Sequence, residues 1–293
     1  MAPDPGPPTS PTLAELRADL HRRICATVLG DRGDPPAPSN ADGSSEQSMA
    51  IARALADALP YQKAQDLPSA QGTGAAFAEA LREFLRRAFE RLAHVRPGPW
   101  HFFTNPAETD ISGFDQYGHL AELRDRLAKD RALRAMLGGD YIVCPDIVVA
   151  RYGLTDDELN ACGPFVDDTA GTQSVLRTKW GEDRRLMHAS VSCKWTIRSD
   201  RAQNSRTEAL NLLRNRRGRA PHIVVATAEP LPSRLASIAY GLGDVDCVYH
   251  LALKELCAAV RTVGNADAQD TLDAMVEGRR LADLADLPLD LAL

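Results

Sequence analysis

The sequence predicts an α/β protein with a central mixed β-sheet flanked by helices. Two observations lead to this fold class. Apolar residues recur at helical spacing through much of the first half of the 293 residues. Strand-like apolar runs then begin near residue 141 and alternate with helices in the order strand, strand, helix, strand, strand, helix. This order is typical of a sheet on which helices pack.

The N-terminal segment is predicted to contain a helix between two irregular regions. Residues 1–10 are rich in proline and are expected to be disordered. Ser10 and Pro11 predict an N-cap and a first helical position, and apolar residues at helical spacing follow over 13–28. Residues 30–48 form a Gly/Pro/Ser/Asp loop that is long for a compact domain, so it is either functional or disordered.

Three further helices are predicted before the strands. A short helix covers about 49–58, and a second loop contains Gln71-Gly72-Thr73-Gly74. A long helix then presents an apolar face from Phe77 to Leu92 and ends near Pro97-Gly98, because proline and glycine do not continue a helix. Another amphipathic helix is expected over roughly 116–137.

The second half supplies the strands. Residues 141–150 form a near-continuous apolar run, as expected for a strand buried on both faces. Residues 188–197 alternate, with polar side chains including Ser192 and Lys194 on one face and apolar ones on the other. The remaining predicted elements, in order, are a helix over 200–215, strands over 222–227 and 245–251, and helices near 252–263 and 268–278.

The composition is that of an ordinary globular protein, with 44% hydrophobic and 25% charged residues. A net charge of −6 argues against a protein that coats nucleic acid without regard to sequence. Residues 192–219, however, contain Lys194 and seven arginines against Asp200 and Glu208, a local balance of +6 that leaves −12 for the rest. A local DNA site would explain this segment, and a solvated basic helix face is the plainer interpretation of charge alone.

Cysteine usage and the ends of the chain favour a cytoplasmic protein. The six cysteines contain no CxxC pair, and four of them lie in apolar runs, as expected for reduced core residues rather than zinc ligands or disulfides. These four are Cys144, Cys193, Cys247 and Cys257. The sequence shows neither a membrane-spanning apolar run nor a signal peptide. We expect one domain over residues 11–293.

A set of residues on adjacent elements points to phosphodiester chemistry. Asp146 follows Pro145 in the first predicted strand, Ser192-Cys193-Lys194 ends the second, and Glu208 lies on the next helix. Carboxylates can hold Mg²⁺, and a lysine can orient or deprotonate a water and offset phosphate charge. A lone Pro-Asp is usually a turn, and a lone strand lysine is usually an edge residue. Their combination with Glu208 is much more specific.

With these residues the chain resembles the type II restriction endonucleases that recognise CCGG cores. The matching segments are Ser39-Asn40-Ala41-Asp42-Gly43-Ser44, the helix around 83–98, Pro145-Asp146, most of 188–251, and Asp286-Leu287-Pro288-Leu289-Asp290. The resemblance implies a PD-(D/E)XK nuclease fold in which Ser192 occupies the D/E position and Glu208 supplies the missing carboxylate. It also implies Mg²⁺ bound by Asp146 and by the backbone carbonyl of Cys193.

The same resemblance assigns the inner DNA readout. Arg198, Asp200 and Arg201 match the residues with which the family reads the CCGG core in the major groove. The chemistry agrees, because arginine pairs bidentately with guanine and aspartate accepts a hydrogen bond from cytosine N4. Ser199 or Asp200 is also well placed to cap the following helix, and both roles can hold together.

The outer readout is implied in the same way. Asp42 and Ser44 match residues that read the outer base pair, which implies the site GCCGGC, and Gln71 matches a minor-groove contact. The chain departs from the family at one position, where a helical glutamate is replaced by Ala78 and a glutamate follows as Glu79. Since one residue is about 100° of helix rotation, either the helix is shifted or this carboxylate is absent.

The resulting hypothesis is a bacterial, cytoplasmic, Mg²⁺-dependent endonuclease that cleaves double-stranded DNA at GCCGGC and leaves 5′-phosphate ends. A homotetramer built as a dimer of dimers is implied by the resemblance alone. The alternative is a sequence-specific DNA-binding protein with a nuclease fold and weak or no cleavage, which the Ala78 departure favours. An enzyme acting on another substrate would leave Arg198, Asp200 and Arg201 unexplained.

Overall fold

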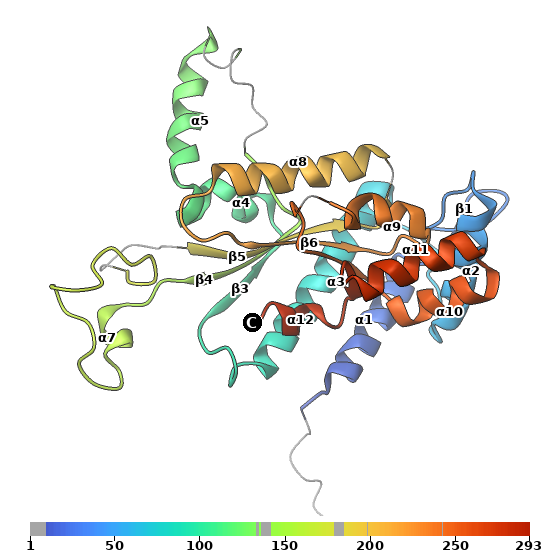
Figure 1. Cartoon of the computed structure of the whole chain (residues 1–293), viewed down its shortest axis with the longest axis horizontal. Helices are drawn as coiled ribbons and strands as arrows, with labels where there is room; N and C mark the ends of the chain where they lie inside the picture. Colours follow the sequence, from blue (N-terminus) through green and yellow to red (C-terminus); the bar gives the residue numbers. More distant parts are fainter. Residues whose placement is uncertain (1–9, 133–134, 136–141, 179–184, 198, 242) are drawn as a thin grey trace, which may run out of the picture.

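A six-stranded sheet forms the centre of the protein, with helices on both faces (Figure 1). The computed structural model describes residues 10–132, 135, 142–178, 185–197, 199–241 and 243–293, with the backbone alone over 199–202. In the view of Figure 1, α8 lies on one side of the sheet, and α1, α3 and α12 lie on the other. Within the described residues, no helix combines the length and apolar character needed to cross a membrane.

The strands follow chain order across the sheet and make it mixed. Their bounds are β3 Trp100–Phe103, β4 Ile147–Tyr152, β5 Arg185–Lys194, β6 His222–Thr227, β7 Cys247–His250 and β8 Leu281–Asp283. The pairs β3–β4 and β4–β5 are antiparallel, and the pairs from β5 to β8 are parallel. The predicted mixed sheet is therefore confirmed. Its parallel half places the carboxyl ends of β5 to β8 at one edge.

The helices account for most of the remaining chain. They are α1 Leu13–Thr27, α2 Glu46–Ala58, α3 Ala70–Arg91, α4 Pro106–Thr109, α5 His119–Lys129, α7 Asp156–Leu159, α8 Ser199–Asn215, α9 Pro232–Ala239, α10 Leu253–Val263, α11 Ala266–Glu277 and α12 Leu287–Asp290. Two 3₁₀ turns, Ile111–Gly113 and Asp115–Tyr117, precede α5. A small ribbon pairs β1 Asp31–Arg32 with β2 Ala37–Pro38.

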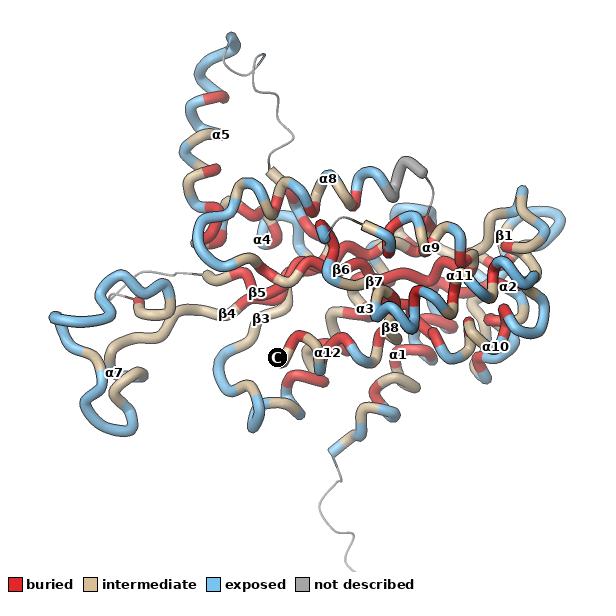
Figure 2. The backbone as a smooth tube through the Cα atoms, viewed as in Figure 1, coloured by how far each residue is buried: buried red, intermediate tan, exposed pale blue. Residues whose placement is uncertain are grey.

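Burial explains why β5 is polar on one face but lies in the core. Figure 2 shows the strands as the most buried part of the chain. The predicted polar face of β5 is itself buried, with Ser190 4% and Ser192 9% exposed, because helices cover both faces of the sheet. Beyond the strand, Trp195 packs edge-on against Phe77 of α3 at a ring distance of 5.5 Å, which fixes α3 beside the end of β5.

Two predicted helix starts are wrong. The N-cap of α1 is Thr12 rather than Ser10, because Thr12 and Glu15 form a reciprocal capping box that Ser10 cannot make. The segment Gln71–Gly74 belongs to the first turn of α3 rather than to a loop. Ser69 caps this helix by accepting a hydrogen bond from the Gly72 backbone N–H at 3.2 Å, so the glycines are held in helical geometry.

Three further expectations change. Strand β4 begins at Ile147 rather than at residue 141, and Cys144 ahead of it is exposed instead of buried. Residues 30–48 are described throughout and contain the β1–β2 ribbon, so this loop has a definite path. Strands β3 and β8 and helix α9 were not anticipated, because each is short and lacks a clear periodic pattern.

Candidate active site at the carboxyl end of β5

The start of β4 and the end of β5 bring Asp146 and Lys194 together. Ile147 pairs with Val191 across the antiparallel ladder, so Asp146 lies beside the last residues of β5. The backbone N–H of Cys193 donates to Asp146 Oδ2 at 2.7 Å, and Lys194 Nζ lies 3.4 Å from the same oxygen. Oδ1 has no hydrogen-bond partner among the described residues, and 41% of the Asp146 side chain is exposed.

Helix α8 contributes Glu208 to the same place. Its Oε2 accepts a hydrogen bond from Ser192 Oγ at 3.4 Å, which is a long contact. Burial raises the pKa of Glu208, and Asp146 raises it further, whereas Lys194 and the Ser192 hydroxyl act in the opposite direction. The predicted residues Asp146, Ser192, Cys193, Lys194 and Glu208 therefore converge on one point of the structure.

An open cavity of about 210 Å³ lies over these residues. It is bounded by the end of β5, the first turn of α3 and one face of α8, which are adjacent in Figure 1. The lining residues are Ala70, Gln71, Gly74, Cys193, Lys194, Trp195, Asn204 and Glu208. Gln71, which the resemblance assigns to the minor groove, is exposed there beside the catalytic candidates. Asn204 was not foreseen, since nothing in the sequence distinguishes it from other surface residues of α8.

The donor set suits a hard divalent cation. Among the described residues, no group of three or more His, Cys, Asp or Glu side chains forms a metal cluster. Mg²⁺ does not need one, because it binds through one or two carboxylates and keeps several waters. Within the part of the chain that the structure describes, Asp146 offers a carboxylate oxygen without a protein partner, and Glu208 offers a second carboxylate with one long contact. Cys193 contacts Asp146 through its main chain, and burial raises the pKa of its thiol, so the thiol is not a suitable ligand.

The resemblance implies a further glutamate at the position of Ala78, where this chain has no carboxylate. Helix α3 is continuous, and Ala78 lies four residues after Gly74, on the helix face that borders the cavity. Glu79 instead accepts hydrogen bonds from Arg82 at 2.6 and 2.8 Å and from Thr104 at 3.4 Å. The Arg82 guanidinium lowers the pKa of Glu79, which is therefore a paired carboxylate turned away from the cavity.

Asp42 lies in a second, neighbouring cavity of about 200 Å³ that shares Ala70 and Trp195 with the first. Its Oδ1 accepts hydrogen bonds from Ser44 Oγ at 2.7 Å and from the Ser44 backbone N–H at 3.0 Å. Its Oδ2 accepts a hydrogen bond from the guanidinium of Arg234 on α9. The Ser44 hydrogen bonds, together with Arg234, lower the pKa of Asp42 to about 2.

Two of the three predicted inner readers, Asp200 and Arg201, belong to α8. Arg198 lies outside the described residues, and the side chains of Asp200 and Arg201 do too, although their backbone forms the first turn of α8. Arg234 was missed by sequence reasoning. No local motif marks it, and its partner Asp42 is 192 residues away in the chain. Only the packing of α9 against the 39–44 loop reveals the pair.

Comparison with known proteins agrees with this geometry. A family model described as the NgoMIV restriction enzyme matches residues 20–293. The chain is also 44% identical over 286 residues to the type II restriction enzyme NgoMIV of Neisseria gonorrhoeae, covering 97% of this chain and 100% of that protein. The predicted resemblance and the restriction-endonuclease-like fold are thereby confirmed. This chain belongs to the NgoMIV family of type II restriction enzymes.

Proposed function

We propose that this protein cleaves double-stranded DNA at GCCGGC in a Mg²⁺-dependent reaction and leaves 5′-phosphate ends. The observation that carries the proposal is the convergence of Asp146, Lys194 and Glu208 at one open cavity. A second cavity, which contains Asp42 and Arg234, adjoins it. Catalytic groups and base-reading groups therefore lie within reach of the same duplex. We expect the enzyme to act in the bacterial cytoplasm, as one domain over residues 11–293.

The residues divide the work of hydrolysis. Lys194, with its ammonium 3.4 Å from Asp146, would orient or deprotonate the attacking water and offset charge on the phosphate. Asp146 and the Cys193 carbonyl would hold the cation, and Glu208 would add the second carboxylate. Bound Mg²⁺ supplies a Lewis acid for the developing charge. Water adds to phosphorus as the bond to the 3′ oxygen breaks, which leaves a 3′-hydroxyl and a 5′-phosphate.

Recognition would use two segments of the chain. Arg198, Asp200 and Arg201 at the start of α8 would read the CCGG core, since arginine binds guanine O6 and N7 and aspartate accepts from cytosine N4. The pair formed by Asp42 and Arg234 offers the same two chemistries side by side, which suits one outer C·G pair. Ser44 holds Asp42 in place, and Gln71 would reach the minor groove.

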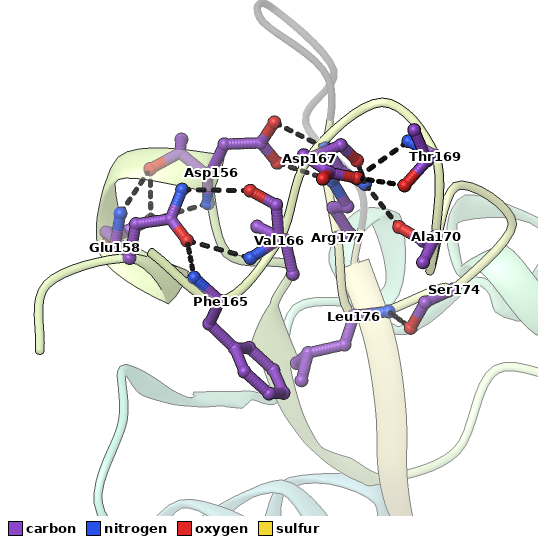
Figure 3. A network of polar contacts seen from close by, with 12 residues as sticks. Asp156, Glu158, Phe165, Val166, Asp167, Thr169, Ala170, Ser174, Leu176 and Arg177 are labelled. Atoms are coloured by element: carbon purple, nitrogen blue, oxygen red, sulfur yellow. Dashed lines mark hydrogen bonds and ion pairs between the residues drawn. The ribbon is translucent and has the colours of Figure 1, made fainter. Parts of the chain in front are cut away.

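We also propose that the enzyme is a tetramer, a dimer of dimers. The loop around α7 projects from the sheet and is fixed by its own polar contacts (Figure 3). Arg177 donates to Asp156 at 2.6 Å and to the Asp167 carbonyl at 2.7 Å. The same loop leaves Phe165 82% exposed. A contact with another subunit would remove this ring from water, which is how the loop would contribute to the tetramer. Light scattering of Phe165→Ala should show a smaller oligomer.

The alternative is a sequence-specific DNA-binding protein that cleaves weakly or not at all. The absence of a carboxylate at Ala78 is the observation that favours it. Incubating a plasmid carrying one GCCGGC site, with and without Mg²⁺, separates the two functions. An endonuclease linearises the plasmid only with Mg²⁺. A binding protein shifts a GCCGGC duplex in a gel and leaves the plasmid supercoiled under both conditions.

A further inference from the structure

Glu229, directly after β6, is a fully buried carboxylate that takes no part in the proposed chemistry. It is 0% exposed, and burial raises its pKa to about 7. Its Oε2 accepts the Ile197 backbone N–H at 2.7 Å, and its Oε1 accepts the Leu231 N–H at 3.1 Å. Burying a carboxylate is unfavourable unless its oxygens are satisfied, so these contacts make Glu229 a fixed point of the structure.

The contact with Ile197 places Glu229 at the start of the inner readout. Ile197 is 1% exposed and immediately precedes Arg198. Its backbone N–H cannot reorient toward solvent without breaking the hydrogen bond to Glu229. The carboxylate therefore sets the direction in which the chain leaves Trp195 and enters the first turn of α8. The readers Arg198, Asp200 and Arg201 follow within four residues of this anchor.

The residues around Glu229 also hold the outer readout. Arg234 Nη1 lies 4.0 Å from Glu229 Oε2, and the same guanidinium binds Asp42. The side chain of Asn40, 1% exposed, donates to the Ala228 carbonyl at 2.9 Å. The loop that carries Asp42 is thus docked on the segment 228–234, which carries Glu229 and Arg234.

We propose that Glu229 is a positioning residue that couples reading of the outer base pair to reading of the CCGG core. This inference rests on the proposed function. Glu229 touches neither DNA nor the catalytic cavity in this role. It acts by holding Ile197 directly and Asp42 through Arg234. The two reading segments, the 39–44 loop and the start of α8, are thereby kept at a fixed position relative to each other. Loss of its charge should then relax discrimination at both sets of bases at once.

The test is the full-length variant Glu229→Gln. Glutamine keeps the size of the side chain, but its amide nitrogen cannot accept one of the two backbone N–H groups, and it has no charge for Arg234. We measure kcat/KM on GCCGGC, on a site with altered outer pairs and on a site with an altered core. Both discrimination ratios should fall by about tenfold, the effect of one hydrogen bond to a charged group.

A double-mutant cycle with Asp42→Ala separates coupling from general damage. If Glu229 acts on the outer pair through Asp42, the double variant should lose no more outer discrimination than Asp42→Ala alone, while core discrimination still falls. Glu255→Gln is the matched control, since Glu255 is part-buried and paired with Arg17 rather than with a residue of either reading segment. It should lower the melting temperature and leave both ratios unchanged.

The possible outcomes are distinct. If Glu229→Gln does not fold, Glu229→Asp keeps the charge with a shorter reach and should show the same two losses to a smaller extent. Ratios within twofold of wild type in the folded variant would overturn the coupling, as would equal changes in Glu255→Gln. A wild-type protein without preference for GCCGGC would instead refute the proposed function.

Discussion

The carboxylates of the candidate catalytic centre and the carboxylate of the 39–44 loop are bonded in opposite ways. Asp42 is held at both oxygens, because Ser44 binds one of them twice and Arg234 binds the other, which leaves acceptor capacity for a base. Asp146 has one oxygen without a partner among the described residues, and Glu208 has a single long contact. Hydrogen bonding lowers the pKa of Asp42, whereas burial raises the pKa of Glu208.

The difference follows from what each carboxylate is proposed to meet. A group that reads a base must point in one direction before DNA arrives, because ordering it during binding would cost affinity. A group that binds Mg²⁺ must instead keep a free oxygen, since the cation replaces any protein donor. Under the proposed function, the same functional group is restrained where it would read a base and left open where it would bind the cation. Substitutions at the two places should separate the two activities.

The largest effect is expected from the catalytic centre. Lys194→Ala and Asp146→Ala should abolish cleavage and spare specific binding, because neither side chain reads a base. Asp146→Ala should also remove the stimulation of binding by Ca²⁺. Cleavage and gel-shift assays on one GCCGGC duplex measure both properties, with Arg214→Ala on the exposed face of α8 as control. More than a few per cent of wild-type cleavage in either variant would contradict the assignment.

The inner readers should show the reverse pattern. Arg198→Ala and Arg201→Ala are expected to weaken binding to GCCGGC by about 1–3 kcal/mol each, with little change on random duplex. Each should leave metal-dependent chemistry intact once DNA is bound. Titrations of specific and random duplexes give the two affinities. An equal loss of affinity for both duplexes would mean that Arg198 contacts only phosphate. The assignment of core recognition to the start of α8 would then be wrong.

A narrower effect is expected at the outer pair. Asp42→Ala should abolish the preference for GCCGGC over other NCCGGN sites, at a cost of about 1–3 kcal/mol, and should still require CCGG. The reason is that Asp42 is assigned to this pair together with Ser44 and Arg234, and both of these residues bind its carboxylate. Cleavage of a library randomised at the two outer positions measures the preference. An unchanged preference would show that the Asp42 carboxylate is structural.

The smallest effect is expected at Glu79. Glu79 is bonded to Arg82 and Thr104 and does not line the cavity. The cleavage rate of Glu79→Ala should therefore differ from wild type by less than the variation between preparations of the surface control Arg214→Ala. Ala78→Glu would add a third carboxylate at the cavity face and should lower the Mg²⁺ concentration needed for half-maximal cleavage. Cleavage rates measured over a range of Mg²⁺ concentrations test both expectations. A marked loss in Glu79→Ala would assign Glu79 to the metal site.

The residues predicted to be catalytic could be proposed from the sequence because strand order and motif both constrain them. Asp146, Lys194 and Glu208 lie on consecutive core elements, and adjacent strands bring the first two together. Sequence reasoning missed Arg234, whose partner Asp42 lies 192 residues earlier, and Glu229, whose buried contact with the Ile197 backbone no motif marks. It also misplaced Gln71–Gly74, since the capping bond from Ser69 outweighed the low helix propensity of glycine.

The separation of reading from cutting is tested most directly by digesting genomic DNA and sequencing every end produced. With Mg²⁺, we expect the wild-type protein to give 5′-phosphate ends at GCCGGC alone. Asp42→Ala should give ends at CCGG with mixed outer bases, and Asp146→Ala should give none. Ends at unrelated sequences from the wild type, or ends at GCCGGC from Asp146→Ala, would contradict the assignment of catalysis and recognition to separate carboxylates.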